Sequence, residues 1–125
     1  MIFDTDILIW IQRGNKKAAK LLQNKDVKQI SIFSYMELLQ CAKDKTQQVV
    51  IRNFLHDLKI ETLPLTENIG HRAAVYIDMF SLSHGLRACD ALIAATAVEN
   101  SQELATSNKK HFQLITELQL KVFKP

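Results

Sequence analysis

From Ala88 to Glu99 the chain reads ACDALIAATAVE, a helix-forming run with apolar residues on nearly every side. A helix that is apolar all round has to be covered by the rest of the protein. Its first turn carries one acid, Asp90, directly before Ala91-Leu92-Ile93. A short apolar strand, Leu104-Ala105-Thr106, is predicted to follow it. We therefore expect this helix to lie deep inside the fold, packed between other elements.

Strands and helices alternate along the whole chain. β-Branched and apolar runs predict strands at residues 1–3, 29–33, 60–63, 104–106 and 121–123. Apolar residues at helical spacing predict helices at residues 5–11, 16–23, 34–40, 46–58, 66–80, 88–99 and 109–112. This alternation is typical of a parallel sheet that helices cover on both faces. The expected fold is a three-layer α/β/α sandwich around a parallel sheet of four to five strands.

Composition fits a single domain over residues 1–125, with 47% apolar and 23% charged residues. The net charge of +3 permits binding to nucleic acid without indicating it. No apolar run is long enough to span a membrane, and Asp4 and Asp6 interrupt the N-terminus, which argues against a signal peptide. Cys41 and Cys89 form no CxxC pair. We expect both to be partly buried in a reducing compartment, as in a cytoplasmic protein.

Three carboxylates stand in apolar surroundings. Asp4 follows Met1-Ile2-Phe3, Glu37 lies within Tyr35-Met36-Glu37-Leu38-Leu39, and Asp90 precedes the apolar helix. An ionised carboxylate in a dry setting is costly unless it is paired, hydrogen-bonded or bound to a metal. In parallel sheets the ligand site lies at the carboxyl ends of the strands, which is where these acids are expected. The pattern predicts a shared cation.

Magnesium or manganese would suit such a carboxylate site. Both cations prefer oxygen ligands, and Mg²⁺ usually takes one or two carboxylates together with water and substrate phosphate. A bound cation can activate water and stabilise the charge that builds on a phosphodiester. Basic side chains around the rim would hold the phosphates of a nucleic acid. The candidates for this role are Arg13, Lys16, Arg87, Lys109 and Lys110.

Four segments resemble the motifs of PIN-domain ribonucleases. They are Ile2-Phe3-Asp4-Thr5-Asp6-Ile7-Leu8-Ile9, then Ser34-Tyr35-Met36-Glu37-Leu38, then His84-Gly85-Leu86-Arg87-Ala88-Cys89-Asp90-Ala91-Leu92-Ile93-Ala94-Ala95-Thr96-Ala97, and last Leu104-Ala105-Thr106-Ser107-Asn108-Lys109-Lys110-His111-Phe112. The third match is the most specific, and the order and spacing of the four cover nearly the whole chain. The small size is similar to that of VapC toxins of type II toxin–antitoxin systems.

The resemblance implies a metal-dependent endoribonuclease that a cognate antitoxin holds inactive. It would cut structured RNA with Mg²⁺ or Mn²⁺, and it would form a homodimer. By matching position, Asp4, Glu37 and Asp90 would bind the metal, and the Thr106 hydroxyl would orient a water or a metal ligand. Many PIN domains carry an acid near Asn108. Some toxins carry it a few residues later, where this chain has Lys110 and His111. Asn108 remains a candidate site residue, because its amide oxygen can accept from water or reach a metal, but it brings no charge and gives less support to a tightly held second metal. No partner for His111 is apparent in the sequence, which argues against a role as general base.

Each candidate also has a purely structural interpretation. Asp4 or Asp90 could cap the helix that follows it, although Thr5 or Asp6 could cap the first helix instead. Glu37 has the capping-box spacing from Ser34. Thr106 could simply end a strand and Asn108 could form a turn. Asp6 was expected to be a cap or a neighbour of the metal ligands. Arg87 could pair with an acid, and Trp10 could pack in the core or at an interface.

Three other functions remain open at this stage. A housekeeping PIN ribonuclease would act without an antitoxin, and a degenerate PIN module would bind RNA or a protein without cutting. A haloacid-dehalogenase-like phosphatase is suggested by Asp4-Thr5-Asp6, with Asp4 as nucleophile and Asp6 as general acid. The Gly-Thr that normally follows that pair is replaced by Ile7-Leu8.

Overall fold

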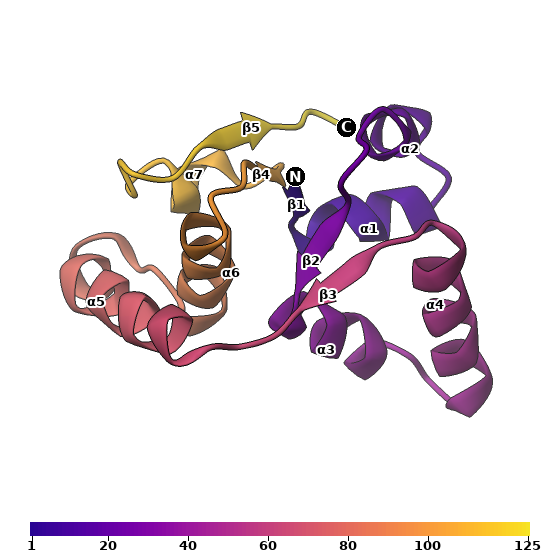
Figure 1. Cartoon of the computed structure of the whole chain (residues 1–125), viewed down its shortest axis with the longest axis horizontal. Coiled ribbons are helices and arrows are strands. Elements are labelled where there is room, and N and C mark those ends of the chain that lie inside the picture. Colours follow the sequence, from indigo (N-terminus) through magenta and orange to yellow (C-terminus); the bar gives the residue numbers. More distant parts are fainter.

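The computed structural model describes all 125 residues and has one central sheet (Figure 1). Its strands are β1 (Ile2–Phe3), β2 (Gln29–Ser31), β3 (Glu61–Leu63), β4 (Leu104–Thr106) and β5 (Leu120–Val122). They pair in the order β3-β2-β1-β4-β5, and every pairing is parallel. The predicted parallel sheet is confirmed, and the chain begins in its central strand.

Seven helices connect and cover the strands. They are α1 (Thr5–Gln12), α2 (Lys16–Gln23), α3 (Ile32–Gln40), α4 (Lys45–Asp57), α5 (Glu67–His84), α6 (Ala88–Glu99) and α7 (Lys109–Phe112). Figure 1 shows α5 and α6 on one side of the strands and α1, α2 and α4 on the other. This is the predicted α/β/α arrangement. None of these helices combines the length and the apolar character needed to cross a membrane.

The core consists of two apolar layers that share the strands. Ile2 and Leu104 belong to the layer under α5 and α6, whereas their neighbours Phe3 and Ala105 belong to the layer on the opposite face. Successive strand residues point to opposite faces, so two adjacent apolar residues fill both layers. The α6 helix is buried along its length, as expected; its fully buried apolar residues are Ala91, Ala94, Ala95 and Ala97.

The structure corrects several predicted helix starts. Strand β2 ends at Ser31 instead of residue 33, and Ser31 is the N-cap of α3, where its Oγ accepts from Ser34 N at 3.0 Å. Ser34 is therefore inside the helix, and the expected capping box with Glu37 is absent. Asp4, not Thr5 or Asp6, caps α1. Asp90 is not the cap of α6, because that position belongs to Arg87.

Two further expectations fail for local reasons. Helix α5 continues past residue 80 and ends at His84, because Gly85 adopts a left-handed conformation with φ of 70°. The Gly85 and Leu86 N–H groups bond back to carbonyls of the last turn. Cys41 is exposed instead of partly buried, whereas Cys89 is partly buried as expected.

Candidate acidic site at the carboxyl ends of the strands

Asp4 and Thr106 meet where two neighbouring strands end. Asp4 directly follows β1, and Thr106 is the last residue of β4, which pairs with β1. The Thr106 hydroxyl donates to Asp4 Oδ2 at 2.7 Å, and Thr5 N donates to Asp4 Oδ1 at 2.7 Å. Both residues are buried. Asp4 thus caps α1 and also faces the site, so its role as a helix cap is compatible with a role in the site.

Glu37 joins the site through hydroxyl groups. The Thr5 Oγ1 lies 2.7 Å from Glu37 Oε1 and 2.9 Å from Ser34 Oγ, and Ser34 Oγ lies 3.3 Å from Ser31 Oγ. The three hydroxyl residues are buried, while Glu37 is half-buried. Thr5 therefore links the two acids, because its hydroxyl donates to Glu37 and its N–H donates to Asp4. Sequence reasoning missed Ser34 as a positioning residue, because the apparent capping box gave it another role.

Asp6 ties the start of α1 to the loop after β4. Its Oδ2 accepts hydrogen bonds from the backbone N–H of Ser107, at 2.9 Å, and from the Ser107 hydroxyl. Its Oδ1 is buried and has no hydrogen-bond partner. Asp6 therefore supports the site from one side and keeps one oxygen free, as expected of an acid beside the metal ligands.

Asp90 faces α7 from the first turn of α6. Its Oδ2 is buried and accepts no hydrogen bond, yet it lies 3.0 Å from His111 Nδ1. Asn108 Nδ2 lies 2.9 Å from the same nitrogen, and Asn108 N donates to Thr106 Oγ1 at 3.0 Å. The structure corrects the expectation that His111 has no partner. The available signal was its position one helical turn after Asn108.

Burial and neighbouring acids raise the pKa of Asp4. Loss of water raises the pKa of Asp4 to about 7, and the charges of Asp6 and then Asp90 add to this effect. The hydrogen bonds from Thr106 and Thr5 favour the ionised form and offset part of the rise. The site therefore concentrates negative charge that its own residues do not neutralise. A bound cation would neutralise part of this charge.

The donor set fits a cation that completes its shell with water. No three acidic, imidazole or thiol groups of this chain form a cage around one point. Mg²⁺ seldom has such a cage, because it usually keeps several waters and binds one or two carboxylates and substrate phosphates. Two buried carboxylate oxygens, Asp6 Oδ1 and Asp90 Oδ2, have no hydrogen-bond partner. The assignment of Asp4, Glu37 and Asp90 as metal ligands stays a prediction.

All five basic candidates are exposed, but they divide into two groups. Arg87 precedes α6, and Lys109 and Lys110 begin α7, so these three flank the acids in the chain. Arg87 forms no ion pair, contrary to one of its two interpretations. Arg13 and Lys16 lie beyond the far end of α1, about 12 Å along the helix from Asp4.

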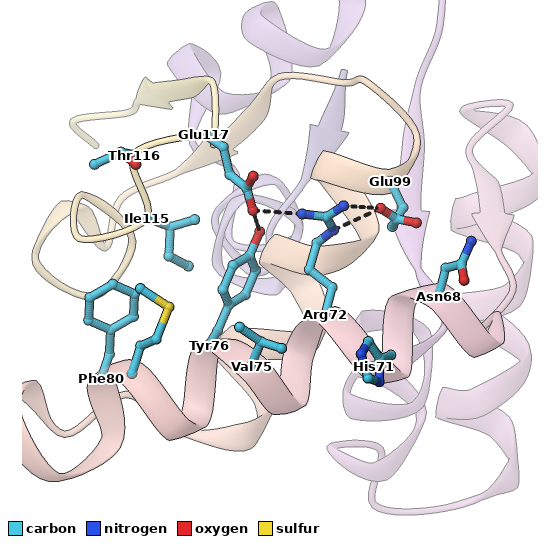
Figure 2. A pocket seen from close by; sticks show the side chains of 11 residues that line it. Asn68, His71, Arg72, Val75, Tyr76, Phe80, Glu99, Ile115, Thr116 and Glu117 are labelled. Atoms are coloured by element: carbon cyan, nitrogen blue, oxygen red, sulfur yellow. Dashed lines mark hydrogen bonds and ion pairs between the residues drawn. The ribbon is translucent and has the colours of Figure 1, made fainter.

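The largest cavity lies elsewhere in the molecule. It has a volume of about 630 Å³ and is lined by α5, Glu99 and residues 115–117 (Figure 2). Glu99 is at the opposite end of α6 from Asp90, about 14 Å away along the helix. In Figure 2 the Arg72 guanidinium bridges the two acids, 2.7 Å from Glu99 Oε2 and 2.8 Å from Glu117 Oε1. These charges compensate one another, unlike those around Asp4.

A smaller groove of about 260 Å³ lies between α1, α3 and α4. Most of its lining is apolar; the residues are Ile9, Gln12, Leu38, Cys41, Ala42, Gln47, Val50 and Ile51. Val49 and Val50 of α4 are more than half exposed, as is Met36 of α3. The groove and Glu37 share helix α3, which contributes Leu38 to the groove.

Comparison with known proteins agrees with this geometry. The family model of the PIN domain matches residues 1–117. The chain is similar to a toxin–antitoxin complex from Klebsiella pneumoniae, with 29% identity, a TM-score of 0.79 and coverage of 94% of this chain and 93% of the other. It is also similar to VapBC-1 from nontypeable Haemophilus influenzae, with 25% identity, a TM-score of 0.79 and coverage of 98% of both chains.

A third solved structure shares the fold at lower identity. This is VapBC2 from Rickettsia felis bound to a DNA fragment from its promoter, with 23% identity, a TM-score of 0.77 and coverage of 99% and 100%. Among curated proteins, none matches the chain significantly.

Proposed function

This chain belongs to the PIN domain family, and from that membership we propose that it is the toxin of a VapBC-like toxin–antitoxin system. PIN domains are nucleases, so the chain is a hydrolase that acts on nucleic acid. The proposed substrate is RNA and the proposed cofactor is Mg²⁺ or Mn²⁺. The observation that carries the proposal is the buried, uncompensated carboxylate cluster around Asp4, at the strand ends of a PIN fold.

The residues of the site would have separate roles in such a nuclease. Asp4, Glu37 and Asp90 would hold the cation, which when bound supplies an activated water and neutralises charge on the phosphodiester. Thr106 and Thr5 keep the Asp4 and Glu37 carboxylates in place through their hydrogen bonds. The exposed cations next to the acids bind the RNA phosphates on either side of the scissile bond; these are Arg87, Lys109 and Lys110.

The proposed protein partner is a cognate antitoxin. Solved structures similar to this chain are toxin–antitoxin complexes, and the groove between α1, α3 and α4 offers a mostly apolar surface. An apolar segment of the antitoxin would cover this groove. Val50→Asp places a charge on its rim and should weaken the complex, which calorimetry with the co-expressed partner would measure.

Cleavage of total cellular RNA tests the enzymatic proposal. The purified protein, free of antitoxin, should give discrete fragments with Mg²⁺ or Mn²⁺ and none with EDTA. Asp90→Asn should abolish cleavage, whereas Asp57→Asn, at an exposed carboxylate on α4, should cut like the wild type. Intact RNA from folded wild-type protein under all conditions would contradict the nuclease and favour the RNA- or protein-binding module.

Two alternatives differ from this proposal in ways that can be tested. A housekeeping PIN ribonuclease would cut RNA equally well, and it would differ by causing no growth arrest that a neighbouring gene product relieves. The dehalogenase-like phosphatase reading of Asp4-Thr5-Asp6 is displaced by the PIN domain match.

A further inference from the structure

His111, Asp90 and Asn108 present three polar atoms at one point beside the acidic site. The His111 Nδ1 lies 3.0 Å from Asp90 Oδ2 and 2.9 Å from the Asn108 side-chain amide. Asp90 is 91% buried, being 9% exposed, and its Oδ2 accepts no hydrogen bond. An imidazole nitrogen and a buried carboxylate oxygen thus face each other at contact distance.

These three side chains offer the kinds of atom that bind metal cations. A carboxylate oxygen, an imidazole nitrogen and an amide oxygen can each be a ligand, and here they converge beside a buried oxygen without a hydrogen bond. Adjacent ligands of an octahedral cation with bonds of about 2.1 Å lie about 3.0 Å apart. The distances from His111 Nδ1 to Asp90 Oδ2 and to the Asn108 side-chain amide, 3.0 Å and 2.9 Å, match this spacing.

We propose that His111 and Asn108 complete the cation site with Asp90, in the place where the family pattern carries a fourth acid. The proposal rests on the metal-dependent function proposed above and specifies its metal. The Asn108 amide would then turn its oxygen towards the cation, because amide oxygens bind hard cations and the amide nitrogen does not. Water and substrate phosphate would fill the positions that these residues, Asp4 and Glu37 leave open.

An imidazole ligand changes which cation the site prefers. Mg²⁺ favours oxygen ligands, whereas imidazole suits transition metals. A site in which an imidazole and an amide replace a fourth acid also carries less negative charge than a site with four acids. The inferred site therefore favours a transition-metal cation such as Mn²⁺ over Mg²⁺.

Pulsed electron paramagnetic resonance on the Mn²⁺-loaded protein tests nitrogen coordination directly. The wild type should show the ¹⁴N coupling of a directly bound imidazole, and His111→Asp should lose it. His56→Gln is the matched control, because the His56 side chain is 90% exposed on α4 and far from the acids; it should keep the coupling. Absence of the coupling in the wild type, or its persistence in His111→Asp, would overturn the proposal.

Calorimetric titration with Mn²⁺ and with Mg²⁺ supplies the second readout. His111→Asp should lower the ratio of Mn²⁺ to Mg²⁺ affinity about tenfold or more, because an oxygen replaces the nitrogen ligand. His111→Gln should also weaken Mn²⁺ binding. Unchanged affinities for both cations in both variants would leave His111 as an ion-pair partner of Asp90 and refute the proposal. Far-UV circular dichroism confirms that each variant is folded.

The same titrations separate this proposal from the proposed function. If Asp90→Asn abolishes binding of both cations while the His111 variants bind like the wild type, only the further inference fails. If the folded wild type binds neither Mn²⁺ nor Mg²⁺, both the further inference and the proposed metal-dependent nuclease are contradicted.

Discussion

At the scale of single residues, Asp4 is subject to effects that change its pKa in opposite directions. Burial and the charges of Asp6 and Asp90 raise its pKa to about 7 from 3.8, while Thr5 and Thr106 donate hydrogen bonds to its ionised form. A group with a raised folded-state pKa stabilises the fold most below its unfolded pKa. This stability is lost as the pH rises through the folded pKa. The metal-free protein should therefore lose stability between about pH 4 and pH 7.

Asp4→Asn should remove the part of this loss of stability that comes from ionisation of Asp4. Asparagine cannot ionise, yet its oxygen can accept from Thr5 N and its amide can donate to the Thr106 hydroxyl. With EDTA present, the variant should be more stable than the wild type at pH 8 and should lack the decline contributed by Asp4. Urea unfolding at pH 5 and pH 8 measures both quantities. Asp78→Asn, on the exposed face of α5, is the control and should keep the wild-type slope.

Thr106 is a positioning residue, and its hydroxyl does the positioning. It donates to Asp4 Oδ2 and accepts from Asn108 N. Thr106→Val keeps the shape and removes both bonds, so RNA cleavage should fall about 10- to 100-fold. Thr106→Ser keeps the hydroxyl and should cleave within about threefold of the wild type. Equal loss in both variants would show that the methyl group, and thus packing, is what matters.

At the scale of elements, the ends of helices place the functional side chains. Asp4 sits where β1 passes into α1, and Asn108 where β4 passes towards α7. Asp90 stands in the first turn of α6, whose start is set by the Gly85 turn that ends α5. The α5–α6 connection is therefore part of what positions Asp90.

The same substitution at two glycines should have opposite effects on α5. Gly85→Ala forces alanine to a φ of 70° at the helix end and should destabilise the protein by about 1 kcal/mol. Gly70→Ala lies inside α5, where an added methyl group meets nothing within 4 Å, and should stabilise it by about 0.5–1 kcal/mol. Thermal unfolding compares the two. A shift in the same direction for both would contradict the conformational argument.

At the scale of the whole molecule, one helix face is left uncovered. Val75, Met79 and Leu82 are exposed and lie on one face of α5, at spacings of four and three residues. Such a stripe suits a second copy of this chain, in line with the expected homodimer. Trp10, which was expected to pack in the core or at an interface, packs partly buried against the core, with Arg13 5.9 Å from its ring centre.

We therefore expect the wild type to sediment as a dimer and the double variant Met79→Glu/Leu82→Glu to sediment as a monomer at the same concentration. Charges placed in an apolar interface would have to be buried without partners. Val27→Glu is the matched control, because Val27 is 51% exposed in the loop before β2. It should sediment like the wild type. Identical sedimentation of all three proteins would place the interface elsewhere or exclude it.

The sequence predicted the features that depend on local pattern. Helices α2, α6 and α7 and strand β4 have the predicted bounds, because their apolar spacing and flanking polar residues act within one or two turns. The buried acids Asp4 and Asp90 stood out for a similar reason, since a carboxylate inside an apolar run is costly and needs a function or a partner. The order of strands and helices then implied a parallel sheet and a site at its carboxyl edge.

Only the tertiary structure decided which side chains meet at that edge. Asp6 binds Ser107, Thr5 reaches Ser34 and Glu37, and His111 faces Asp90. These partners are far apart in the chain, and no periodicity links them. Parallel strands bring their ends together in an order that the sheet sets, so the contacts depend on the pairing of β1 with both β2 and β4. A local pattern carries no information about that pairing, because its stability comes from the packing of the whole domain.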